Sequence, residues 1–401
     1  ISYVICVLPN GHIGNLYFGK RLSQQDSYLH LLEGRHRAMT SYVYEDDENF
    51  SLQHTRQEYA CYGTGDFSLP AFEIKQADGS LLSNFVFEDY RIFSGKPTLE
   101  GLPATYVEKE SEATSLEIQL IDKVSETRLF LLYTIYENLA AVTRSARFEQ
   151  LGQQEIRLTR ALSLTLDLPD KHYDWLHLDG AWSRERHLVR TPLSQGCQSV
   201  YSLKGASSSE HNPFLALLRP HADEHQGEVL GFSLVYSGNF LAQIDVTPYQ
   251  QTRVSLGIHP EHFEWPLAQG NHFQTPEVVI VYSEEGLNGL SQSYHNLYQK
   301  RLARGYWRDK ERPILLNNWE AMTFDFDEER ILKLAQQAAD VGVELFVMDD
   351  GWFGARDNDQ AGLGDWKVNL NKLPNGLTGV IAKVHEMGMS FGLWIEPEMV
   401  N

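Results

Sequence analysis

Two adjacent carboxylates, Asp349 and Asp350, follow an apolar run at residues 345–348 and precede Gly351 and Trp352. The run is typical of a strand buried on both faces, as in a parallel sheet that is covered by helices. In such sheets and in barrels, the groups that bind ligands lie at the carboxyl ends of the strands. Asp-Gly is also common turn chemistry, so the motif alone leaves a ligand site and a simple turn as equal alternatives.

Four tryptophans lie at or just past the ends of predicted strands: Trp319, Trp352, Trp366 and Trp394. Sugars present flat C–H faces that stack on aromatic rings, while sugar hydroxyls need carboxylates and amides as partners. Core packing is the ordinary role of any single tryptophan. Four of them near an acid pair make a carbohydrate site an equally good interpretation.

Glu396 ends a third apolar run, at residues 391–396. Together with Asp350 it would offer the two carboxylates that a glycosidase uses. The interpretation we favour is that Glu396 supports the site as a hydrogen-bond partner. No metal site is predicted, because His172, His177 and His187 lack further metal ligands around them.

The C-terminal part of the chain alternates short strands with helices. A strand at 314–316 is followed by a helix with Asp325 as its N-cap and Gly342 as its C-cap signal, and a second helix stops at Gly388. Such alternation predicts right-handed βαβ units and a parallel sheet. The polar and aromatic strand ends indicate the mouth of a (β/α)8 barrel. Three strands cannot close a barrel, so more than half of it is expected outside this chain.

The first 285 residues show the alternation of strands instead. Examples are residues 115–121, 129–133 and 278–282, separated by Gly, Asp, Asn and Ser turns. Many short strands with such turns predict a large β-sandwich. A helix of about five turns follows from residue 287. The expected domains are therefore a sandwich at 1–285, a linker helix at 286–310 and the first three βα units of a barrel at 311–401.

Composition excludes several classes of protein. The 401 residues include 34 basic and 54 acidic side chains, a formal net charge of −20, which argues against binding to nucleic acid or to anionic membranes. Three scattered cysteines predict neither a disulfide scaffold nor a zinc site, and they fit a reducing cytoplasm. No apolar run approaches the roughly 20 residues of a membrane span. The chain begins without Met and stops at Asn401, so we expect a fragment of a longer protein.

Several segments resemble the α-galactosidases of glycoside hydrolase family 36. In the C-terminal part these are PILLNNWEAM (313–322), LFVMDDGWFG (345–354), LGDW (363–366), LPNGL (373–377) and FGLWIEPEMV (391–400). In the N-terminal part they are QEYACYGTGDF (57–67), GAWSRERH (180–187), HNPFLALLRP (211–220) and GFSLVYSGNFLAQ (231–243). The resemblance implies an N-terminal β-supersandwich, a (β/α)8 catalytic TIM barrel and a further C-terminal β domain.

The same resemblance implies a function. It is the hydrolysis of terminal α-1,6-linked galactose from melibiose, raffinose and related oligosaccharides, with retention and without a cofactor or metal. Asp349 and Asp350 would then bind galactose hydroxyls, and Trp319 and Trp394 would shape the walls of the pocket. Trp366 is a further candidate for substrate binding, and Glu396 would act in support.

No catalytic residue is expected in this chain, because the family's nucleophile and acid/base aspartates would lie after Asn401. The expected partners are α-galactoside oligosaccharides, with neither nucleic acid nor membrane. A cytoplasmic homo-oligomer, a tetramer by resemblance, is expected. Two alternatives stay open: a galactosyltransferase related to raffinose synthase, and, for these 401 residues alone, a non-catalytic carbohydrate-binding module.

Overall fold

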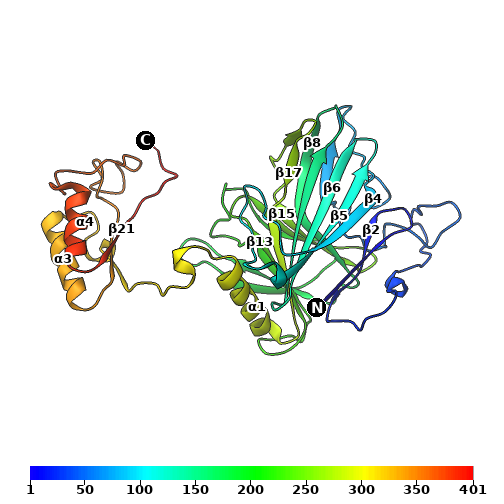
Figure 1. The fold of residues 1–401 in the computed structure, drawn as a ribbon, viewed down its shortest axis with the longest axis horizontal. Helices are drawn as coiled ribbons and strands as arrows, with labels where there is room; N and C mark the ends of the chain where they lie inside the picture. The colour runs from blue at the N-terminus through cyan, green and yellow to red at the C-terminus, as the bar shows by residue number, and fades with distance from the viewer. Residues whose placement is uncertain (401) are drawn as a thin grey trace. The chain divides into compact units, whose positions relative to one another are not determined.

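The computed structural model describes residues 1–400 and divides the chain into two compact units, Ile1–Arg304 and Gly305–Asn401 (Figure 1). We call them unit 1 and unit 2. Each unit has hydrophobic cores of its own. The helices of residues 1–400 include none with the length and apolar character of a membrane span.

Unit 1 is built from antiparallel strands (Figure 1). The larger sheet has the strand order β10-β9-β12-β13-β18-β7-β6-β5-β4, with β17 paired to β7. Its strands are β4 (Val86–Ser94), β5 (Ala113–Asp122), β6 (Thr127–Tyr136), β7 (Ala141–Gln150), β9 (Asp174–Asp179), β10 (His187–Pro192), β12 (Phe214–Leu218), β13 (Val229–Val235), β17 (His272–Gln274) and β18 (Glu277–Ser283).

The smaller sheet has the order β11-β14-β15-β8-β16, with β3 paired to β8, and a separate hairpin joins β1 to β2. These strands are β1 (Ser2–Val7), β2 (Ile13–Gly19), β3 (Phe72–Lys75), β8 (Ile156–Leu168), β11 (Gly196–Ser202), β14 (Phe240–Val246), β15 (Thr252–Ile258) and β16 (Trp265–Leu267). Short 3-10 turns lie at Leu29–Leu31 and Glu110–Glu112.

The two sheets pack face to face. Leu164 and Val254 of the smaller sheet share one hydrophobic cluster with Leu217, Phe232 and Ile280 of the larger sheet. A second cluster joins residues of β3 and β8 to residues of β5, β6 and β7 in the same way. Successive side chains of a strand point to opposite faces, so the alternating runs bury one face of each sheet. The predicted β-sandwich is confirmed.

Helix α1 (Gly286–Arg301) covers the outer face of the larger sheet. Strand β18 is apolar on both sides, so Val279 and Val281 face the helix while its alternate residues face the sandwich core. Leu290, Tyr294 and Leu297 of α1 are buried against those valines. The helix expected as a linker is therefore packed within unit 1. The predicted division at 1–285, 286–310 and 311–401 stays a prediction.

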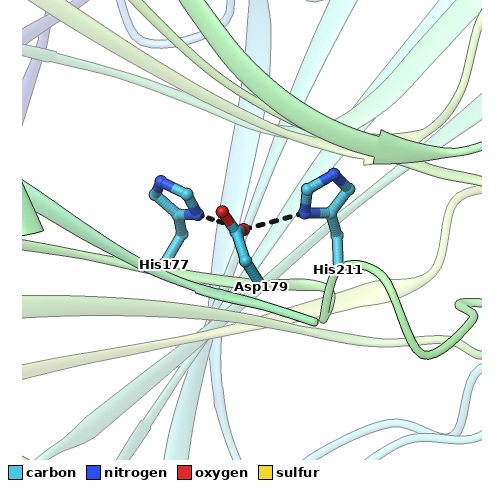
Figure 2. A group of neighbouring side chains, drawn as sticks. All are labelled: His177, Asp179 and His211. Carbon is cyan, nitrogen blue, oxygen red and sulfur yellow. Dashed lines mark hydrogen bonds and ion pairs between the residues drawn. The ribbon is translucent and has the colours of Figure 1, made fainter. Parts of the chain in front are cut away.

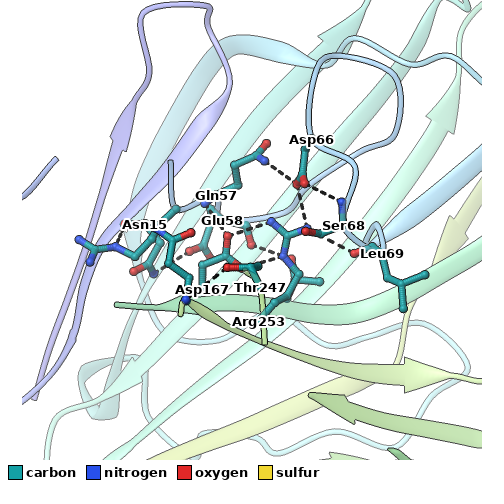
Figure 3. Close-up of polar contacts among 12 residues, drawn as sticks. Asn15, Gln57, Glu58, Asp66, Ser68, Leu69, Asp167, Thr247 and Arg253 are labelled. Carbon is teal, nitrogen blue, oxygen red and sulfur yellow. Dashed lines mark hydrogen bonds and ion pairs between the residues drawn. The ribbon is translucent and has the colours of Figure 1, made fainter. Parts of the chain in front are cut away.

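A network of buried hydrogen bonds and ion pairs links residues 57–66 to the smaller sheet (Figure 3). Arg253 of β15 contacts Asp167 of β8 through Nε at 2.7 Å and Nη2 at 2.9 Å, and its Nη1 lies 2.8 Å from Asp66. Asp167 also accepts the backbone N–H of Gln57 at 2.8 Å, and the Gln57 amide donates to Asp66 at 2.6 Å. Each charged group is thus paired and hydrogen-bonded, as burial demands.

Unit 2 is a three-stranded parallel sheet with crossover helices (Figure 1). Its elements are a 3-10 turn at Tyr306–Arg308, β19 (Leu315–Asn317), α2 (Trp319–Met322), α3 (Glu328–Asp340), β20 (Leu345–Met348), α4 (Gly376–Glu386) and β21 (Ser390–Leu393). The strand order β19-β20-β21 follows the chain, as expected for successive βαβ units. The predicted start of a β/α region is confirmed.

One predicted helix start is wrong. The N-cap of α3 is Asp327, whose side chain accepts the backbone N–H of Arg330 at 2.9 Å. Asp325 lies two residues too early and instead pairs with the Arg330 guanidinium at 2.8 Å. The predicted end is confirmed, because Gly342 follows the helix with a φ of 89°.

Candidate functional site

The three parallel strands of unit 2 bring their carboxyl ends to one edge of the sheet. Asn317 of β19 lies opposite Val347 of β20, which lies opposite Gly392 of β21. The residues that follow each strand therefore emerge side by side, and they include Asp349 and Trp394. We call this set of strand ends the strand edge. It is where α/β proteins bind their ligands.

Asp349 is held at the strand edge by two asparagines. Its carboxylate accepts a hydrogen bond from the Asn317 side chain at 2.5 Å, and its backbone N–H donates to Asn318 Oδ1 at 2.8 Å. Asn318 is fully buried, and its Oδ1 is the atom that supports the loop. The second oxygen of Asp349 accepts the backbone N–H of Asp350 at 2.7 Å. A carboxylate offers about four acceptor positions, so Asp349 keeps roughly half of its capacity for a ligand.

Asp350 is committed to an ion pair that the sequence pattern does not reveal. The Arg356 guanidinium contacts both of its oxygens, with N–O distances of 3.0, 3.1 and 2.8 Å. Both residues are 6% exposed. Hydrogen bonding to Asp350 raises the pKa of Arg356, against the effect of burial. The single Nε–H of Arg356 is shared between both oxygens, and Nη2 donates to Oδ2. Asp350 is buried whereas Asp349 is half-buried, so Asp349 is the more available of the two acids.

Glu396 acts on the same guanidinium. It is half-buried three residues after β21, and its negative charge contributes to the raised pKa of Arg356, after the contributions of Asp350 and Asp359. The supporting role of Glu396 stays a prediction.

Three of the four tryptophans gather in one aromatic cluster. Trp366 and Trp394 are half-buried with ring centroids 6.3 Å apart, and Phe353 lies 4.5 Å from Trp366. Trp352 is 3% exposed and donates its Nε1–H to the Trp394 carbonyl at 3.0 Å, so it belongs to the core. Trp319 begins α2, is half-buried, and contacts the ring of Phe324 edge-on at 5.0 Å.

Lys372 ties the loops of the strand edge together. Its ammonium group donates to the backbone carbonyls of Phe324, Gly351 and Arg356 at 2.9, 3.1 and 3.3 Å. It also pairs with Asp357 at 2.9 Å. A single cation therefore fixes the loops that follow α2 and β20. Neither Lys372 nor Arg356 was among the predicted site residues, because nothing in local spacing marks a side chain that bonds to distant loops.

The strand edge offers no obvious place for a metal. Among residues 1–400, the grouping of His, Cys, Asp and Glu that is close enough to share an ion lies in unit 1. The arrangement at the strand edge instead supplies hydrogen-bond acceptors, an arginine-supported acid and aromatic faces. These groups suit a neutral polyhydroxylated ligand.

Comparison with known proteins gives the family. Residues 11–268 match the glycosyl hydrolase family 36 N-terminal domain, and residues 272–401 match the melibiase domain. This chain belongs to glycoside hydrolase family 36. Alpha-galactosidase AgaA of Geobacillus stearothermophilus is 52% identical over 400 residues, which cover 100% of this chain and 55% of that protein.

Solved structures of the family agree with this fold. The crystal structure of AgaA matches with a TM-score of 0.96 at 52% identity, again over 100% of this chain and 55% of the other. An alpha-galactosidase from Lactobacillus brevis matches with a TM-score of 0.97 at 42% identity, over 100% and 54%. AgaA variants have been solved in complex with raffinose and with stachyose. The family 36 chain described here thus spans about half the length of these relatives.

Proposed function

We propose that the protein acts as an α-galactosidase that releases terminal α-1,6-linked galactose from melibiose, raffinose and related oligosaccharides with retention. In this proposal, the chain supplies the sugar-binding edge of the pocket. The observation that carries it is the convergence of Asp349, Asp350 and Trp394 at the ends of adjacent parallel strands. The names of the relatives, which are α-galactosidases, give the sugar.

The contacts of Asp349 and Asp350 suggest a separate role for each acid in binding galactose. Asp349 has free acceptor positions and would take hydrogen bonds from galactose hydroxyls, each worth about 1.5–3 kcal/mol because the acceptor is charged. Asp350 would contribute its remaining acceptor capacity and would be held in place by Arg356. Trp394, Trp319 and Trp366 would line the walls, where sugar C–H faces pack on rings.

The chemistry itself is proposed to use two aspartates beyond Asn401. A retaining glycosidase places its two carboxyl groups about 5–5.5 Å apart on either side of the scissile bond, and both must be free to react. The commitment of Asp350 to Arg356 supports a role in binding instead. Glu396 is assigned to support, through its charge on Arg356.

The test is a chimera in which residues 1–401 are joined to the segment that follows the matching region of AgaA. We expect release of p-nitrophenol from p-nitrophenyl α-galactoside, with the α-anomer of galactose as the first product by NMR. A folded chimera that is inactive on every α-galactoside would contradict the proposal. Inclusion of sucrose as an acceptor separates hydrolysis from galactosyl transfer, since a transferase would form raffinose.

The same chimera carries the test of the site residues. Asp349→Ala should lower kcat/KM more than about 100-fold, because it removes charged hydrogen bonds to the sugar and misplaces the sugar for reaction. A variant with unchanged kinetics would refute the assignment.

A cytoplasmic location and a tetrameric assembly are further parts of this proposal. Light scattering on the same protein measures the assembly.

A further inference from the structure

Two histidines and an aspartate meet on the larger sheet of unit 1 (Figure 2). His177 and Asp179 are two residues apart on β9, so their side chains share one face of the strand. His211 pairs with Asp179 through an antiparallel bridge from the neighbouring segment. The Nδ1 atoms of His177 and His211 lie 2.6 and 2.9 Å from the same carboxylate oxygen of Asp179.

The surroundings of the cluster differ from one side to the other. The His177 side chain is 7% exposed, and its ring lies 4.2 Å from that of Trp175, which fixes its orientation. The side chains of His211 and Asp179 are 30% and 37% exposed. The His177 side chain is therefore held in place against the Trp175 ring, while the side chains of Asp179 and His211 are open to solvent. An ion can reach the cluster without unfolding the sheet.

We propose that His177, Asp179 and His211 bind a divalent transition metal ion of the zinc class. Two imidazole nitrogens and one carboxylate oxygen, all within 4.8 Å of one another, form the donor set that zinc prefers. Ligand atoms around a tetrahedral zinc ion with bonds of about 2.0–2.2 Å are separated by about 3.3–3.5 Å. The observed separations of 2.6 and 2.9 Å must widen by about 0.4–0.9 Å to reach that spacing. Water would complete the coordination.

The same three residues are also satisfied without an ion. One carboxylate oxygen has two lone pairs and accepts an Nδ1–H from each histidine. On metal binding, each neutral imidazole carries its proton on Nε2 instead of Nδ1, so no other reactant is required. The two states therefore differ in the position of a proton on each ring, and this difference can be measured. The cluster uses none of the residues of the strand edge.

The experiment is a zinc titration of the whole 401-residue chain after treatment with EDTA, in competition with a chromophoric chelator. All variants carry Cys197→Ser, because Cys197 is exposed and thiols bind zinc. We expect one zinc ion per chain, and more than about 10-fold weaker binding in His211→Gln, since a ligand is lost. The matched control is His172→Gln, which removes an exposed histidine from the same sheet region and should leave the affinity unchanged.

A second measurement covers the case in which His211→Gln does not fold. Histidine ¹⁵N spectra of the Cys197→Ser protein report which ring nitrogen carries the proton. At saturating zinc, two histidines should change from Nδ1–H to Nε2–H. The proposal is overturned if the protein binds no zinc, if His211→Gln binds it equally well, or if both rings keep Nδ1–H. In that case the cluster is a hydrogen-bonded triad alone.

Discussion

The ion pair between Asp350 and Arg356 can be tested by removing its cation. Arg356→Met keeps much of the length and apolar stem of the side chain but removes the guanidinium. The wild-type pair has N–O distances of 3.0, 3.1 and 2.8 Å, and its side chains are 7% and 9% exposed. The variant would leave the Asp350 carboxylate without its counter-ion where water scarcely reaches it. Loss of one partner of a buried pair costs about 3–5 kcal/mol of unfolding free energy.

Urea unfolding followed by tryptophan fluorescence measures this cost. With an m-value of about 1–3 kcal/mol per molar, a loss of 3 kcal/mol moves the midpoint of the unit 2 transition by about 1–3 M. Arg356→Lys should lose less, because it keeps the charge and gives up the two-pronged contact. Asp350→Asn and the double variant complete a cycle that isolates the pairwise term. A free energy of unfolding within about 0.5 kcal/mol of wild type for Arg356→Met would refute the description of Asp350 as a buried, arginine-supported acid.

Two further predictions concern the contacts of Lys372 and the ion pair between Arg301 and Glu112. Lys372→Met should destabilise unit 2 by about 2–4 kcal/mol in the same assay, since it removes three charged hydrogen bonds to backbone carbonyls. The control Lys383→Met breaks an exposed pair with Glu386 and should leave the stability close to that of wild type. Equal losses in the two variants would contradict the assignment of Lys372 as the cation that holds the loops of the strand edge. Hydrogen bonds from Arg301 lower the pKa of Glu112 below its ordinary value of 4.5, so Glu112 stabilises the fold above about pH 4.5, and this contribution is lost as pH falls through the lowered pKa. Thermal melts of Glu112→Gln should therefore fall below wild type at pH 7 and converge with it near pH 2; a constant difference across that range would refute the assignment.

Most of the architecture could be predicted because it depends on local periodicity. The apolar run at 345–348, the helical spacing after residue 327 and Gly342 each act within a few residues, and all three lie in the expected elements. The predicted N-cap lies two residues too early, because Asp327 has the same side chain as Asp325 and lies closer to the helix. The choice between them depends on the chain path, which the sequence pattern does not report.

The support of the site could not be predicted in the same way. Arg356 and Lys372 reach their partners through loops whose conformation is set by tertiary packing. The nearest signal was the presence of a basic residue six positions after Asp350. The cluster of His177, Asp179 and His211 could not be predicted for a related reason, since His211 is 32 residues from Asp179 and the two meet only when the sheet forms. Spacing rules detect ligands on one element, and this cluster is shared between two.

The packing of α1 on β18 decides where the chain can be divided. A polypeptide ending at residue 285 would have every strand of the sandwich, yet it would expose Val279 and Val281 on the outer face of the larger sheet. An uncovered apolar face of this kind promotes self-association. A polypeptide ending after Arg304 would keep the helix and the clamp of Arg301 on Glu112. The boundary between the two units therefore follows α1, at Arg304, although the change from strands to helices in the sequence comes before α1.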